Sequence, residues 1–105
     1  MSSSTLTVDQ KGVILTWSDA AERLLGYTSA DAVGQPVELI IPAQLRRPHS
    51  TGFQRYVQTG QSKLPEVVTT SALHKNGRIV RLKISVKAVR GQHGDIIAVD
   101  ATMNH

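Results

Sequence analysis

The stretch RIVRLKISVKAV, residues 78–89, decides the fold class because its apolar side chains recur at every second position. The odd positions from 81 to 87 carry charged or hydroxyl side chains instead. A period of two is typical of an antiparallel strand that buries one of its faces. The stretch therefore predicts a strand whose even positions turn towards a core, namely Val80, Leu82, Ile84, Val86 and Ala88.

Four further strands are predicted on either side of this one. The turn KNG (75–77) joins it to EVVTTSALH (66–74), and the turn RGQHGD joins it to DIIAVDATM (95–103). Near the N-terminus, TLTV (5–8) and VILTW (13–17) flank DQKG, a sequence that favours a tight turn. The five runs predict a five-stranded antiparallel sheet, made of an N-terminal hairpin and a C-terminal meander.

Short helices are predicted between the two groups of strands. Ser18 can cap the helix that begins with DAAERLL, and Gly26 suits its end. A second short helix begins after Thr28 or Ser29 and ends at Gly34. Helices this short are not stable alone, so they must pack on the sheet.

The remaining part of the middle region predicts a longer helix. The segment PVELII (36–41) is a short helical turn or an extended link. Pro48 suits the first position of the next helix, and Gly60 suits its end. The order of elements is that of an α+β domain, in which helices cover one face of the sheet and enclose a pocket.

Composition limits the classes of function. A chain of 105 residues is expected to form a single domain, 1–105. The absence of cysteine excludes disulfides, thiolate metal sites, thiol nucleophiles and cysteinyl–flavin chemistry. No apolar run approaches the roughly 20 residues of a membrane span, and MSSSTLTVDQKG lacks the features of a signal peptide. We expect a cytoplasmic protein that does not enter a membrane.

Nucleic-acid binding and catalysis are not expected. The net charge of +4 comes from scattered basic residues, with few aromatic side chains to stack on bases, which indicates a solvated surface. No Gly-x-Ser-x-Gly motif and no pair of histidines at helical metal-site spacing is present. His74, His93 and His105 are expected to be exposed, and Trp17 is expected in the core or at a dimer contact.

Several segments resemble a PAS domain. They are VDQKGVILTWSDAAERLLGYTSADAVGQPVELIIP, HKNGRIVRLKISVKAV and the final IIAVDATM. The resemblance runs from about Leu6 to Met103, and it implies the PAS fold and a sensory or interaction module. Such modules are commonly attached to a histidine kinase, a cyclase or phosphodiesterase, or a transcription regulator. We expect this one to be non-catalytic and to form a homodimer.

The segment IIPAQLRRPHSTGFQRY resembles the haem-binding oxygen-sensor PAS domains of the FixL and direct-oxygen-sensor type. In those domains a Pro-x-x-x-Arg-x-x-His run supplies the axial ligand of haem iron. Pro42, Arg46 and His49 stand at the corresponding places here. The resemblance implies haem b as the cofactor, His49 as its iron ligand, and a gas- or redox-sensing role.

Further cofactor contacts are expected, Arg55 from the resemblance and the others from the predicted fold. Arg55, with Lys63, would pair with the haem propionates at the rim. The apolar side chains expected around the ring are Phe53, Val68, Leu82, Ile84 and Val86. The relatives carry arginine or methionine facing the sixth coordination site, whereas the candidates here are residues 66–69, EVVT.

Two classes of function therefore stay open. One is a ligand-sensing module with haem as its cofactor. The other is a PAS domain without haem, which either dimerises and docks on an effector or senses another small molecule. A histidine at the place of His49 can also be structural and donate to a backbone carbonyl.

Overall fold

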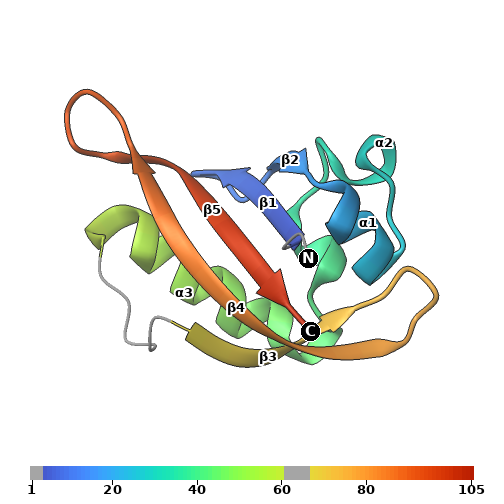
Figure 1. Cartoon of the computed structure of the whole chain (residues 1–105). Helices are drawn as coiled ribbons and strands as arrows, with labels where there is room; N and C mark the ends of the chain where they lie inside the picture. The colour runs from blue at the N-terminus through green and yellow to red at the C-terminus, as the bar shows by residue number, and fades with distance from the viewer. Residues whose placement is uncertain (1–3, 61–66) are drawn as a thin grey trace.

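The computed structural model describes residues 4–60 and 67–105. Its strands form one antiparallel sheet in the order β2-β1-β5-β4-β3. The strands are β1 (Ser4–Asp9), β2 (Ile14–Trp17), β3 (Val67–Leu73), β4 (Ile79–Arg90) and β5 (Ile96–Asn104). Figure 1 shows the sheet as one layer, with helix α3 (Arg46–Thr59) running behind it. The predicted α+β architecture with five strands is confirmed.

The alternation in β4 sets the two faces of the sheet. Val80 and Leu82 are buried, whereas Arg81, Lys83 and Lys87 are exposed. The register pairs Ile84 with Met103 and Val86 with Ala101, so apolar side chains meet on the same face across strands. The predicted inward direction of the even positions is therefore confirmed.

The turn of the N-terminal hairpin is stabilised by the carboxylate of Asp9. Asp9 Oδ1 accepts hydrogen bonds from the backbone N–H groups of Lys11 and Val13, both at 2.9 Å. An aspartate that binds the backbone two residues on closes a tight turn. The turn predicted from DQKG is thus present.

The first helices carry the predicted end signals. Ser18 caps α1 (Asp19–Leu25) by accepting from the N–H of Ala21, and Gly26 ends it in the left-handed conformation. Thr28 caps α2 (Ser29–Ala32) in a reciprocal capping box with Asp31. The next segment forms two 3₁₀ turns, η1 (Val37–Ile40) and η2 (Ala43–Leu45).

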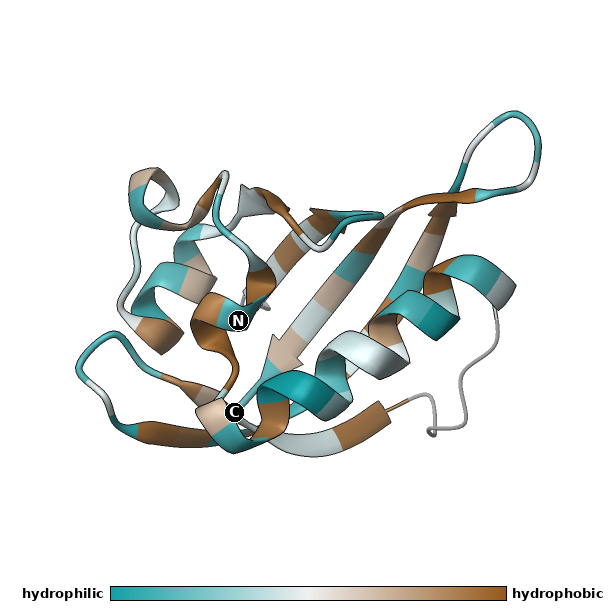
Figure 2. Cartoon of the chain, turned by 180° about the vertical axis from the view of Figure 1, so that it is seen from behind, coloured by the Kyte–Doolittle hydropathy of each residue, from teal (hydrophilic) through white to brown (hydrophobic). Residues whose placement is uncertain are grey.

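Helix α3 begins earlier than the sequence predicts. It starts at Arg46, so Pro48 is its third residue rather than its first, while Gly60 ends it as predicted. Proline is tolerated there because the first-turn N–H groups have no intrahelical partner to lose. In Figure 2 the outward side of α3 is largely hydrophilic and its length crosses the sheet. None of its residues is fully buried, so α3 covers the sheet loosely.

The core lies mainly beneath α1, η1 and the adjacent strands. Ile14, Leu25 and Met103 are among its largest fully buried side chains. Trp17 is 7% exposed, and its indole N–H donates to the carbonyl of Tyr27 at 2.8 Å. Trp17 is therefore a core residue. Tight packing at this end of the sheet leaves the α3 end open for a cavity.

Candidate functional site

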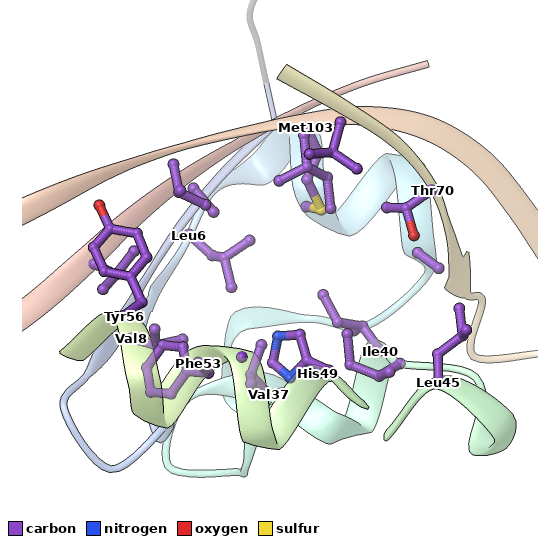
Figure 3. A pocket seen from close by; sticks show the side chains of 18 of the residues that line it. Leu6, Val8, Val37, Ile40, Leu45, His49, Phe53, Tyr56, Thr70 and Met103 are labelled. Atoms are coloured by element: carbon purple, nitrogen blue, oxygen red, sulfur yellow. The ribbon is translucent and has the colours of Figure 1, made fainter. Parts of the chain in front are cut away.

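A cavity of about 380 Å³ lies between α3 and the inner face of the sheet. Its size is within the range of pockets that hold small molecules and cofactors. Figure 3 shows the cavity bounded by α3 and η1 on one side and by the strands on the other. Most of the lining side chains are apolar, including Leu6, Val37, Ile40, Val99 and Met103.

His49 is a titratable side chain that α3 points into this cavity (Figure 3). Its ring stacks nearly parallel on Phe53, with ring centroids 6.0 Å apart and planes inclined by 17°. Burial lowers the pKa of His49 below its ordinary value, and the nearby Glu38 carboxylate acts in the opposite direction. The imidazole is thus favoured as the neutral ring, which is the form that binds metals.

The nitrogens of His49 have different surroundings. Nδ1 is buried and has no hydrogen-bond partner among the described residues. The ring presents a nitrogen to the cavity in Figure 3. A buried imidazole nitrogen without a protein partner is unusual, because buried polar atoms are nearly always paired.

Polar groups lie at a few places on the cavity wall. Arg55 is exposed on α3, two turns beyond His49, and lines the cavity at its solvent side. Thr70 of β3 faces the cavity, and Figure 3 shows its hydroxyl directed inward. Tyr56 lines the cavity from α3, half-buried. The arrangement suits a mostly apolar ligand with one acidic edge, held by imidazole on one side and guanidinium at the rim.

Seven of the side chains that the sequence singles out as cofactor contacts lie in the described residues, and the structure brings six of them together. They are His49, Phe53, Arg55, Val68, Ile84 and Val86, and all six line the cavity. Leu82 does not line it: the side chain is 2% exposed and packs in the core. It faces the same side of the sheet as Ile84, but lies two residues nearer the start of β4 and belongs to the core cluster that includes Leu25 and Ile40. Lys63 and Glu66 fall outside the described residues.

Sequence reasoning missed two features of the site. Among residues 67–70 of β3, Val67 and Thr69 are exposed, and Val68 and Thr70 line the cavity. The register Val68–Ile84 and Thr70–Leu82 fixes this assignment, and residues 66–69 did not include Thr70. Glu38 was also missed, because a glutamate in the run PVELII has no sequence signal for proximity to His49.

His74 differs from its expected exposure. Its side chain is half-buried, and its Nδ1 accepts a hydrogen bond from the N–H of Asn76 at 3.1 Å. Its ring lies directly over Gly26, at the end of α1. His74 therefore serves the packing of the β3–β4 turn and not the cavity.

None of the helices within residues 4–60 and 67–105 has the length and apolar character needed to cross a membrane.

Known proteins resemble the chain in sequence and in structure. The sensor protein FixL of Bradyrhizobium diazoefficiens is 37% identical over 54 residues, which cover 51% of this chain and 11% of FixL. The PAS domain of a protein from Colwellia psychrerythraea superposes with a TM-score of 0.81 at 20% identity, covering 97% of this chain and 84% of that one. The PAS domain of the quorum-sensing receptor RpfR from Cronobacter turicensis, solved in complex with C12:0, gives a TM-score of 0.79 at 17% identity, covering 99% and 93%.

A family match covers most of the chain, whereas the chain covers only a small part of each curated relative. The chain spans 6% to 12% of the length of the curated relatives that it matches. A family model described as PAS domain matches residues 2–104, nearly the whole sequence. With the five-stranded sheet and the cavity beside it, this match shows that the chain belongs to the PAS domain family and is a sensory PAS domain.

Proposed function

We propose that the chain is the sensing module of a longer signalling protein and that its cavity binds haem b, with His49 as the iron ligand. The observation that carries this proposal is the His49 imidazole, whose pKa is lowered by burial, directed into a cavity whose lining is mostly apolar. Bound haem would supply an iron centre for a diatomic gas or for a redox change.

The residues of the cavity fit such a group. His49 would hold the iron, and Phe53, stacked on its ring, restricts the orientation of the imidazole. Arg55 would pair with a carboxylate at the solvent side. Val68, Ile84 and Val86 on the opposite wall would pack against the flat apolar surface and keep water away from it. Val86 is 43% exposed, so a ligand could cover part of this wall.

The proposal is tested by titrating the purified, ligand-free protein with haemin and recording the Soret band. We expect stoichiometric uptake by the wild type, with a band position that changes in His49→Ala. His93→Ala is the matched control, because His93 is exposed in the β4–β5 turn. Arg55→Ala should weaken uptake, whereas Arg47→Ala, exposed on the same helix but outside the cavity lining, should not. No uptake by the wild type, or an unchanged spectrum in His49→Ala, would rule out the ligand role.

A second candidate is an apolar small molecule other than haem. The likeness to the RpfR PAS domain, solved with C12:0, and the apolar lining favour it. In that case Arg55 would pair with the carboxylate of an acyl chain and His49 would need no iron. Failure of haemin uptake, combined with a rise in melting temperature on adding dodecanoate, would favour this candidate.

The wider role is inferred from the family and from the small fraction of its relatives' length that the chain spans. We propose that the domain is cytoplasmic, has no catalytic activity of its own, and regulates an attached or partner effector such as a kinase, a cyclase or phosphodiesterase, or a transcription regulator. We also propose a homodimer formed through the outer face of the sheet, where Val67 and Ile79 are 53% and 48% exposed. A monodisperse monomer by light scattering at high protein concentration would contradict the dimer.

A further inference from the structure

Two buried polar side-chain atoms lack a hydrogen-bond partner among the described residues: Nδ1 of His49 and Oε2 of Glu38. Both residues line a second cavity of about 320 Å³, which shares Val37, His49 and Phe53 with the first. This second cavity lies between η1, α3 and the β1–β2 turn, and its lining is polar, with Lys11 and Gln54 among its members. His49 therefore forms part of the wall between an apolar cavity and a polar one.

The two unpaired atoms are chemically complementary. A neutral imidazole carries one N–H donor, and an ionised carboxylate offers only acceptors. Glu38 is held in place by the hydroxyl of Ser50, which donates to Oε1 at 3.2 Å and leaves Oε2 unused. The carboxylate is close enough to His49 for its charge to act on the ring. Leaving both atoms unpaired would cost about 1–3 kcal/mol for each, so pairing them is strongly favoured.

We propose that Glu38 is the positioning residue for His49. In solution its Oε2 accepts a hydrogen bond from Nδ1–H, a contact that needs the two side chains to move closer together than they are in this structure. This bond places the proton on Nδ1, leaves Nε2 unprotonated towards the apolar cavity, and fixes the orientation of the ring. A carboxylate behind an imidazole in this way also raises its strength as a metal ligand. Only that last consequence rests on the proposed haem function.

The tautomer of His49 in the ligand-free protein tests the proposal without any cofactor. Long-range ¹H–¹⁵N correlation spectra at about pH 8, where histidine is neutral, distinguish Nδ1–H from Nε2–H. The signals of His49 are identified by their absence in His49→Ala. We expect wild-type His49 to be in the Nδ1–H form, with the Hδ1 proton protected from exchange with solvent. Wild-type His49 in the Nε2–H form would overturn the proposal.

Variants of Glu38 test whether its hydrogen bond to His49, rather than the burial of His49 alone, sets the tautomer. Glu38→Ala should shift His49 towards the Nε2–H form, whereas Glu38→Gln, whose carbonyl can still accept, should keep Nδ1–H. Glu22→Ala is the matched control, since Glu22 is an exposed acid on α1. An unchanged tautomer in a folded Glu38→Ala would overturn the proposal. If Glu38→Ala does not fold, an exchange-protected Hδ1 in the wild type supports it and a freely exchanging one contradicts it.

Haemin affinity gives a separate measurement that depends on the proposed function. We expect Glu38→Ala to bind haemin about 10- to 100-fold more weakly than the wild type, and Glu38→Gln to retain most of the affinity. If the wild type takes up no haemin but shows the Nδ1–H tautomer, the haem proposal fails and the role of Glu38 stands. If haemin binds equally to the wild type and to Glu38→Ala, the positioning role fails and the haem proposal stands.

Discussion

Gly26 holds the turn between β3 and β4 against the end of α1, and replacing it with alanine should destabilise the domain. Its φ is +84°, a conformation that costs a residue with a Cβ about 1–2 kcal/mol. A Cβ at Gly26 would also lie 2.6 Å from Cε1 of His74, too close for the ring to stay where it is. Overpacking of this kind costs about 1–3 kcal/mol. The two contributions together give about 2–5 kcal/mol for Gly26→Ala.

Gly34→Ala is the matched control for the backbone contribution. Gly34 has a φ of +90°, and an added Cβ there would meet no atom within 4 Å. It should therefore cost only the conformational part, about 1–2 kcal/mol. For a domain of this size, these losses correspond to decreases in melting temperature of roughly 8–20 °C for Gly26→Ala and 4–8 °C for Gly34→Ala.

Thermal and urea denaturation, followed by circular dichroism, measure both variants. A double variant, Gly26→Ala with His74→Ala, should be less destabilised than the sum of the two single variants, because removing the ring removes the steric part. Equal losses for Gly26→Ala and Gly34→Ala would refute the contact between Gly26 and His74. Losses below about 0.5 kcal/mol for both would refute the left-handed backbone at these positions.

Three further predictions concern the core, the surface and the cavity. Trp17→Phe removes the indole N–H that donates to the carbonyl of Tyr27 and leaves this carbonyl unpaired. The free energy of unfolding, measured by urea denaturation, should fall by about 1–3 kcal/mol. An unchanged midpoint would contradict the hydrogen bond. The Lys75 ammonium, which donates to Asp31, holds the pKa of Asp31 below its ordinary value. A lowered folded-state pKa gives stability that is present above about pH 4 and is lost as the pH falls through the folded-state pKa, so Lys75→Met should raise the pKa of Asp31 in NMR titrations. If haem binds as proposed, Thr70→Val should change the stretching frequency of carbon monoxide bound to it, because Thr70 lines the cavity. Thr69→Val should not change it, because Thr69 is exposed on the other face of the sheet. Equal spectra for both variants would show that Thr70 does not contact the ligand.

Local signals in the sequence determined most of the secondary structure. Ser18 and Gly26 mark the two ends of α1 because a cap and a left-handed glycine act within one turn of the chain. The alternation in residues 78–89 predicted the inner face of β4 because successive side chains of a strand point to opposite sides. The start of α3 was predicted two residues late, because proline is compatible with several first-turn positions and does not define one.

Two kinds of evidence in the sequence predicted the candidate site: the face of the strand on which a side chain lies, and the family resemblance. The resemblance at Pro42, Arg46 and His49 identified this histidine as a cavity residue, and the structure places it at the cavity. The same alternation could not separate Leu82 from Ile84, because both face inward and only the tertiary packing decides where the core ends and the cavity begins. Thr70 was missed because the strand pairing that turns it inward depends on β4.

What the sequence by itself determined is the order of the elements, the buried face of the sheet and the histidine that meets the cavity, since each of these depends on neighbouring residues. What only the tertiary structure decided is which side chains from distant segments share that space. Glu38 and His49 are eleven positions apart in different elements, and nothing in either segment predicts that their unpaired polar atoms line the same cavity. That proximity results from the packing of η1 against α3, which brings together residues that local propensity cannot relate.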